Sequence, residues 1–286
     1  MYAQGFSLSG FLPRGQPGLR AKQLQLLHVR YPNATGTYPH AINNSGEIVG
    51  DYVDSSNVIH GFSYFEWTFS PIDVPHATFT AANDVNNQGI IVGNFGVSSS
   101  QSEGFILRNG SFEVLEYPGS SSTGVAGVND SGKVVGNYST SNGLNGFVWR
   151  PTDGYKKLDY PNSTSTSINA INNQGEMTGQ VSPPFISAFE YANGQWTDFY
   201  YPDAMTTTGD GINNTGEIVG IWSPQNPNAP QEGFLRDSEG NFTEINFPNS
   251  SGTAASGIND FGAIVGYYTD SSNKTHGFIA IPNARK

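Results

Sequence analysis

A twelve-residue stretch, AINNSGEIVGDY, recurs along this chain with few changes. Its first asparagine has five counterparts, spaced at 43, 43, 43, 41 and 46 residues. The six positions are Asn43, Asn86, Asn129, Asn172, Asn213 and Asn259. Periods of about 40 to 50 residues are typical of propeller blades. The repeat therefore predicts an array of similar supersecondary units and constrains the fold more than any other feature.

Each repeat is expected to form four short strands. A strand leads from a recurring threonine, such as Thr37, to the asparagine, and "NNSG" or "NDSG" makes a tight turn. A second strand contains a recurring glycine, such as Gly50, which we expect to make room for an aromatic ring of the next blade. A third strand opens with "HGF" or a variant, and a fourth ends in an aromatic residue and proline.

The two ends of the chain predict a closed ring. The last repeat stops after its third strand, at "HGFIAIPNARK", and the chain opens with an unpaired fourth strand, "LLHVRYP". Pairing these segments would remove the open sheet edges. We predict an all-β fold, a six-bladed β-propeller with four antiparallel strands per blade, closed by the N-terminal strand. Residues 1–23 are expected to form an N-terminal arm, and residues 24–286 a single propeller domain.

Charge and composition narrow the classes of partner. The formal net charge is -11, with only 13 basic residues, which disfavours binding to nucleic acid. No stretch approaches 18 consecutive apolar residues, so membrane insertion is not expected. There is no cysteine, which excludes disulfides and thiolate metal sites. The first 23 residues lack the features of a signal peptide, although "YAQGF" is compatible with the start of a processed exported chain.

The repeat resembles a known bacterial group. "GINNTGEIVG", "HGF" and "IDVP" are similar to the extracellular HAF-repeat family, named for a His-Ala-Phe motif that His60-Gly61-Phe62 and His276-Gly277-Phe278 match here. The resemblance covers about residues 24 to 282. It implies a β-propeller at the cell surface or secreted, and it carries no catalytic residues. The fourth repeat departs from the pattern, with "SAF" at 187–189.

Two positions at the exit of each second strand suggest a ligand site. Eight and nine residues after the asparagine, an amide or carboxylate often precedes an aromatic ring, a combination suited to sugars. The candidate ligand-binding residues are Asp51, Tyr52, Asn94, Phe95, Asn137, Tyr138, Trp222 and Tyr268. The alternative interpretation is packing between blades. The recurring threonines likewise could bind a ligand or tie blades together.

Catalytic and metal signals are weaker. His40 and Asp210 occupy equivalent positions near the expected axis and are the candidate catalytic residues. His60, His276, Glu103 and Glu232 stand at equivalent places on the third strands, where they should diverge around the ring. We therefore predict no metal site and no cofactor.

Three classes of function follow. The first is an extracellular, monomeric binding module for carbohydrate or another small polar ligand, acting through loops on one face. The second is a propeller enzyme, a glycoside hydrolase or polysaccharide lyase, with one site at the mouth of the central channel. The third is a scaffold for protein partners. Equivalent aromatic pockets would favour the first, one asymmetric titratable cluster the second, and an exposed apolar patch the third.

Overall fold

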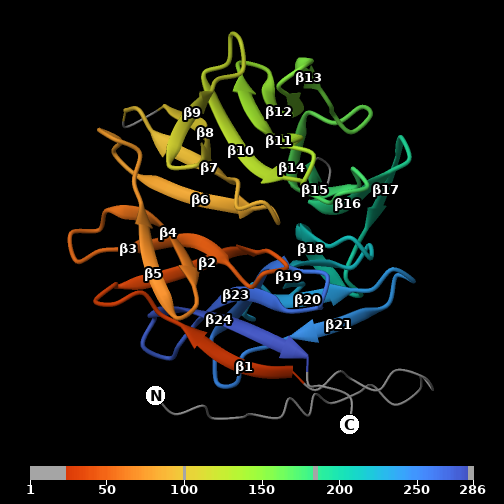
Figure 1. Ribbon diagram of the computed structural model, residues 1–286. Helices are drawn as coiled ribbons and strands as arrows, with labels where there is room; N and C mark the ends of the chain where they lie inside the picture. Colours follow the sequence, from red (N-terminus) through yellow and green to blue (C-terminus); the bar gives the residue numbers. More distant parts are fainter. Residues whose placement is uncertain (1–23, 99–100, 183–185, 283–286) are drawn as a thin grey trace.

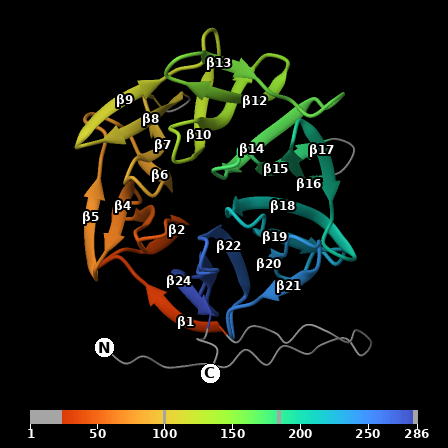
Figure 2. The ribbon, with the colours of Figure 1, turned by 45° about the vertical axis from the view of Figure 1, so that its right-hand side comes forward.

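The computed structural model describes residues 24–98, 101–182 and 186–282, and all of its regular elements are β-strands. The expected arm at residues 1–23 lies outside the described residues. Four four-stranded sheets and one eight-stranded sheet surround a common axis (Figures 1 and 2). This is an all-β, propeller-like fold. The described residues include no helix with the length and apolar character to cross a membrane.

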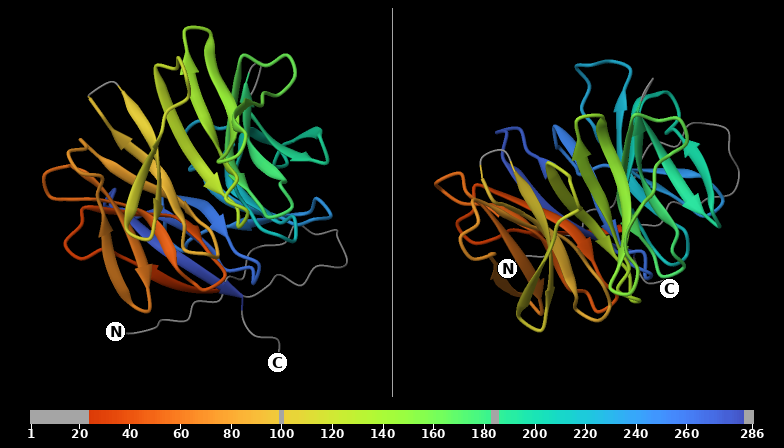
Figure 3. Two further views of the ribbon diagram at one scale, coloured as in Figure 1. Left: turned by 45° about the horizontal axis from the view of Figure 1, so that its top comes forward. Right: turned by 90° about the horizontal axis from the view of Figure 1, so that it is seen from above.

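In each repeat the first strand lies nearest the axis and the later strands follow outward, and two further views show the sheets arranged around that axis (Figure 3). The first sheet holds β2 (Gly36–Ile42), β3 (Ile48–Val53), β4 (Ile59–Phe65) and β5 (Thr68–Ile72). The next holds β6 (Thr80–Val85), β7 (Ile91–Gly96), β8 (Ser102–Arg108) and β9 (Ser111–Leu115). A third holds β18 (Ala204–Ile212), β19 (Ile218–Pro224), β20 (Glu232–Arg236) and β21 (Phe242–Ile245).

The eight-stranded sheet contains two repeats. One half is β10 (Ser122–Val128), β11 (Val134–Thr140), β12 (Gly143–Arg150) and β13 (Gly154–Lys157), and the other is β14 (Ser165–Ile171), β15 (Met177–Ser182), β16 (Ser187–Ala192) and β17 (Gln195–Phe199). Each half pairs antiparallel throughout. The halves join only through one parallel register pair, Leu144 with Ser165.

The remaining sheet confirms the predicted closure. It orders β1 (Leu24–Val29), β24 (Thr275–Pro282), β23 (Ile264–Thr269) and β22 (Gly252–Ile258). β1 pairs antiparallel with β24 from Leu24–Pro282 to Val29–Gly277. Leu24, Leu26 and Val29 of β1 are buried in the core. The first described strand therefore completes the sheet built from the last three.

A phenylalanine from every third strand is the centre of each repeat's core. The six are fully buried: Phe62, Phe105, Phe147, Phe189, Phe234 and Phe278. Each lies opposite the recurring second-strand glycine of its own sheet, as Phe105 does opposite Gly93. A Cβ on Gly93 would lie 2.0 Å from the Ala81 carbonyl oxygen and 2.8 Å from the Phe105 ring. The prediction of a ring from the next blade is therefore wrong, because the glycine accommodates its own sheet.

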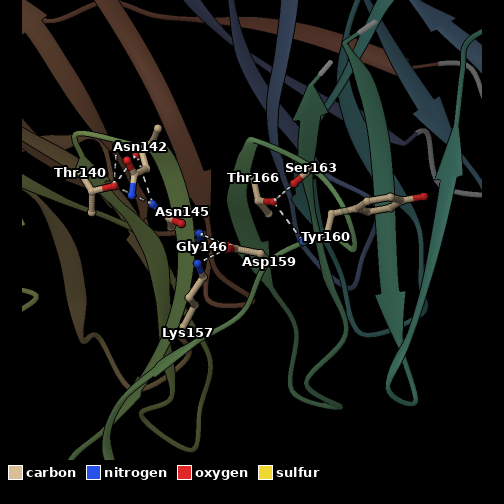
Figure 4. A network of polar contacts seen from close by, with 10 residues as sticks. Thr140, Asn142, Asn145, Gly146, Lys157, Asp159, Tyr160, Ser163 and Thr166 are labelled. Atoms are coloured by element: carbon tan, nitrogen blue, oxygen red, sulfur yellow. Dashed lines mark hydrogen bonds and ion pairs between the residues drawn. The ribbon is translucent and has the colours of Figure 1, made fainter. Parts of the chain in front are cut away.

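The recurring threonines tie one repeat to the next. Each is nearly inaccessible, and its hydroxyl accepts a hydrogen bond from the backbone N–H six residues earlier, at the end of the preceding fourth strand. Figure 4 shows one example, in which the Tyr160 N–H donates to Thr166 Oγ1 at 3.0 Å. The structural interpretation of the threonines holds, since no hydroxyl is open to a ligand.

The repeated asparagines form a closed ring of hydrogen bonds. Each side-chain Nδ2 donates to the backbone carbonyl of the next repeat's asparagine, at 3.0–3.2 Å. The last link runs from Asn259 to Asn43 and joins the last repeat to the first. Each Oδ1 also accepts the N–H four residues later, which shapes the adjacent turn. All six side chains are buried.

A second ring lies one residue further along. Each backbone N–H there donates to the side-chain Oδ1 of the next repeat's counterpart, in the order Asn44, Asn87, Asp130, Asn173, Asn214, Asp260 and back to Asn44. The Oδ2 atoms of Asp130 and Asp260 each accept two flanking asparagine amides. The turn interpretation of "NNSG" and "NDSG" holds, and these carboxylates already have hydrogen-bond partners.

Replacing one ring asparagine should destabilise the whole molecule. Asn129→Ala removes the donor to Asn172 O and leaves the N–H groups of Ser131 and Lys133 without their acceptor. Unsatisfied groups at a buried site cost about 1–3 kcal/mol each. We expect a loss of about 3 kcal/mol or more in urea unfolding. Asn142→Ala, at an exposed turn, is the matched control; equal stability of the two variants would contradict a structural role for the ring.

Candidate functional site

The predicted aromatic ligand platform is part of the core. Tyr138 stacks on Tyr117, with ring centroids 3.6 Å apart, and Tyr268 stacks on Phe247 at 3.7 Å. Tyr138, Tyr268 and Phe95 are 6%, 5% and 8% exposed. In each stack, the partner ring comes from the end of the preceding fourth strand. These rings are not open to a sugar face, and their proposed ligand role is corrected to packing between repeats.

The two remaining aromatic candidates, Tyr52 and Trp222, also stack on a ring from the preceding repeat, but they are more exposed. Tyr52 stacks on Tyr31 at 3.6 Å, and Trp222 stacks on Tyr201 at 4.3 Å. Both are half-buried. One ring face of each is therefore already occupied by the neighbouring repeat.

The polar candidates beside them also join repeats. Asn94 Oδ1 accepts the Val125 N–H at 2.6 Å, and Asn137 Oδ1 accepts the Ile168 N–H at 2.7 Å. Asp51 instead pairs with His40, with 2.5 Å between Oδ1 and Nε2. Each asparagine oxygen is therefore used to hold the first strand of the next repeat, which gives both residues a structural role. Asp51 is bound to His40, which lines the channel.

Tyr138→Ala tests this correction. Removing a buried aromatic side chain typically costs about 3–5 kcal/mol, so we expect a large fall in the midpoint of thermal unfolding. Tyr200→Ala removes the same side chain at a position that is 41% exposed and should cost far less. An unchanged midpoint for Tyr138→Ala would restore the ligand interpretation.

A bulge in each first strand shapes the central channel. The register skips one residue in every first strand, and the skipped residue faces the channel. The six are His40, Asn83, Ala126, Asn169, Asp210 and Ser256. Bulges commonly re-aim a side chain in this way. His40 and Asp210 are thus brought to one channel, as expected from their equivalent positions.

Two carboxyl groups that line this channel, those of Asp84 and Asp210, have raised pKa values. Asp210 receives contacts from Thr208 and Asn169, and Asp84 accepts the N–H groups of Val85 and Val128. Each keeps part of its surface open to the narrow channel and is otherwise covered by protein. This desolvation raises the pKa of both carboxyls to about 7. The channel lining is therefore asymmetric in its titratable groups, which are His40, Asp84 and Asp210.

The size of the channel limits what the cluster can do. The cavity is about 90 Å³, room for a few water molecules. Pockets for small organic ligands are usually about 300 Å³ or more. A sugar ring therefore has no place beside His40 and Asp210, and the channel does not support a glycosidase site.

The raised pKa values predict an inverted pH dependence of stability. Between about pH 4 and pH 7 the folded state holds protons on Asp84 and Asp210 that the unfolded state has released. Their contribution is present at low pH and is lost as pH rises towards 7. We expect Asp210→Asn to reduce the loss of unfolding free energy between pH 5 and pH 8 by on the order of 1 kcal/mol. The exposed Asp203→Asn is the control; parallel pH curves for wild type and Asp210→Asn would refute the shift.

Two histidines outside the channel, His60 and His276, are each paired with a carboxylate. His60 Nδ1 lies 2.9 Å from Asp73 Oδ1, and His276 Nε2 lies 2.8 Å from Asp270 Oδ2. Within the described ranges, no three histidine, cysteine or acidic side chains are grouped so that they could hold a metal ion.

A larger groove lies between the first and last sheets. Its volume is about 320 Å³. The aliphatic lining comes from β1, β24 and β3: Leu27, Val29, Ile279, Ile281 and Ile48. Tyr64, Phe65, Glu66 and Trp67, from the β4–β5 hairpin, line it as well, together with Ser45 and Gly46 of the β2–β3 turn. The Trp67 side chain is 73% exposed.

The turn that presents Trp67 departs from the repeat. Glu66 and Trp67 both have positive φ, 48° and 66°, in a two-residue hairpin loop. The equivalent loops use Asn109-Gly110 and Asn193-Gly194, the pair that this turn type prefers. An exposed tryptophan in the glycine position costs backbone strain, which is often retained at functional sites. The sequence analysis missed these residues, although "FEWT" in place of an Asn-Gly turn was the available signal.

A second exposed aromatic lies on the same face. Phe261 is 72% exposed in the β22–β23 turn. Hydrogen bonds between Asp260 and Asn44 hold that turn against the β2–β3 turn, whose Ser45 and Gly46 line the groove. Trp67 and Phe261 therefore flank one region at the junction of the first and last sheets.

Comparison with known proteins shows the fold alone. The sequence matches no protein-family model and no curated protein. Among solved structures, TolB from Acinetobacter baumannii superposes with a TM-score of 0.60 at 9% identity, over 84% of this chain and 65% of TolB. The SapL1 lectin in complex with alpha methyl fucoside gives 0.55 at 11% identity, over 82% and 88%. A gluconolactonase from Xanthomonas campestris gives 0.54 at 15% identity, over 92% and 91%.

Proposed function

We propose that this protein is a carbohydrate-binding module and that its site is the groove beside Trp67. The observation that carries the proposal is an exposed tryptophan on a strained turn, next to a carboxylate, over a groove of about 320 Å³. The groove falls at the lower end of the size range of small-ligand sites.

The lining has the chemistry that a sugar needs. An indole face stacks on the C–H face of a pyranose, as aromatic side chains with a polar neighbour commonly do. The Glu66 carboxylate can accept hydrogen bonds from hydroxyl groups, and the Tyr64 and Ser45 hydroxyls can donate or accept. Burial raises the pKa of Tyr64, so its hydroxyl stays protonated at neutral pH. Sugar-binding and sugar-related proteins among the structural neighbours support the same class.

A second candidate function, a scaffold for a protein partner, has one observation in its favour. Trp67, Phe65 and Phe261 are 73%, 42% and 72% exposed on one face, and exposed apolar patches often mark protein interfaces. The two functions separate experimentally, because Phe261 does not line the groove, whereas Trp67 does.

Trp67→Gly should weaken glycan binding and slightly stabilise the fold. Glycine adopts the positive φ of this position without strain, so the midpoint of thermal unfolding should stay equal or rise. Binding would be measured on a glycan array and then by calorimetry with the best ligand. Loss of the indole ring on which the sugar stacks should weaken binding about tenfold or more, which corresponds to a loss of about 1.4 kcal/mol or more in binding free energy.

Phe261→Ala is the matched control for an exposed aromatic on the same face. It should leave glycan affinity unchanged. Equal binding by wild type and Trp67→Gly would exclude the groove, and no glycan retained by wild type would exclude the carbohydrate class. Capture of a protein partner that both variants lose would favour the scaffold.

We also propose the number of propeller blades, the domain bounds, the family and the location of the protein. Counting the halves of the eight-stranded sheet as separate blades, as the single bridge at Leu144 and Ser165 suggests, makes the propeller six-bladed. Residues 24–286 then form one domain. Membership of the HAF-repeat family, export to the cell surface or medium, and a monomeric state are proposals that rest on the repeat motifs and on the closed ring.

A further inference from the structure

A small basic cluster lies on the outer edge of the closing sheet. His28 and Arg30 are exposed and two residues apart, and Arg30 follows directly after β1. The Tyr268 hydroxyl behind them receives an Arg30 Nη2 hydrogen bond at 3.1 Å and lies 3.3 Å from His28 Nδ1. Tyr268 is held in turn by its stack on Phe247. One buried phenol therefore orients both cationic side chains.

Some cations of this acidic chain are paired with carboxylates. Arg236 pairs with Glu190 at 3.1 Å, and Lys157 pairs with Asp159 at 2.8 Å. Within residues 24–98, 101–182 and 186–282, no carboxylate lies within ion-pair distance of the Arg30 guanidinium. Arg108, Lys133 and Lys274 of the same residues have no ion pair either, so what distinguishes Arg30 is that it shares one phenol with a histidine. One of its N–H groups bonds Tyr268, which leaves several donors for a ligand.

The other charged groups near the cluster are His276 and Asp270 and, along the groove that His28 lines, Glu66. His276 of β24 faces Tyr268 and pairs with Asp270 at 2.8 Å. The hydrogen bond from His276 lowers the pKa of Asp270 to about 2, so this carboxylate stays ionised and offsets His276. Burial, Arg30 and His276 lower the pKa of His28. The surplus positive charge is therefore that of Arg30, joined by His28 when it is protonated.

We propose that Arg30 and His28, positioned by Tyr268, bind an oxyanion, a carboxylate or phosphate group carried by a ligand at the edge of the closing sheet. A guanidinium offers paired N–H donors that match two oxygens of such a group. The protonated imidazole adds a second charged donor. His28 also lines the groove beside Trp67, but Arg30 and Tyr268 do not, and the argument uses neither Trp67 nor the aliphatic lining of the groove.

The test is an NMR titration of the histidine rings, of which the chain has five. Inorganic phosphate and galacturonate would be added separately at constant ionic strength, at pH 5.5 and pH 8. We expect a saturable shift of the His28 ring signals and a rise in the pKa of His28, because a bound anion cancels the repulsion from Arg30 and His276. Binding of galacturonate, whose carboxylate is ionised at both pH values, should be tighter at the lower pH because His28 is then protonated. The two probes distinguish a phosphate ligand from a carboxylate ligand.

Arg30→Gln should weaken binding about tenfold. Arg30→Lys keeps the charge but loses the paired N–H donors, so its affinity should lie between those of wild type and Arg30→Gln. Arg150→Gln removes an equal charge at another exposed position and should bind as wild type does. Unfolding midpoints would verify that each variant is folded. Non-saturable shifts, or equal weakening in Arg30→Gln and Arg150→Gln, would show general screening only and overturn the proposal.

Discussion

Hydrogen bonds from one asparagine side chain to the next repeat's backbone hold this molecule together at its axis. Each asparagine shapes its own turn through Oδ1 and reaches the neighbouring repeat through Nδ2, so one residue type carries both local and tertiary structure. The bonds form a closed cycle, and its last link joins Asn259 to Asn43. The first strands are therefore held close together, which leaves a channel of only about 90 Å³. That narrowness decides against a sugar site at His40 and Asp210.

Most residues that recur in every repeat make contacts that hold the fold together. The threonines bond the segment after the preceding fourth strand, and rings such as Tyr138 and Tyr268 stack on a ring from the preceding repeat. The amide oxygens of Asn94 and Asn137 hold the first strand of the next repeat. Surface that a ligand can reach arises where the repeat is broken. Glu66-Trp67 replaces an Asn-Gly turn, Phe261 occupies a turn position that is polar in the other copies, and Arg30 directly follows the strand that closes the ring.

The propeller class and the closing strand were predictable from sequence because they follow from spacing and from the matching chain ends. Turn chemistry at Asn43 and its counterparts was predictable for the same local reason. The direction of Tyr138 and Tyr268 was not. An aromatic residue at a strand exit suits both a ligand platform and a stack, and only the position of Tyr117 or Phe247 distinguishes them. Likewise, the partner of the second-strand glycine depends on register between strands, which the repeat alone leaves open.

The sequence by itself determined the repeat unit, the strand order within it and the way the two ends of the chain complete one sheet. Each of these follows from the spacing of the repeated residues. Only the tertiary structure decided which polar and aromatic residues remain available to a ligand. Availability depends on what the neighbouring repeat places against a side chain, and that contact is made between residues about forty positions apart. Trp67 stays open because its turn projects beyond the sheet, whereas Tyr138 meets a ring from the preceding repeat.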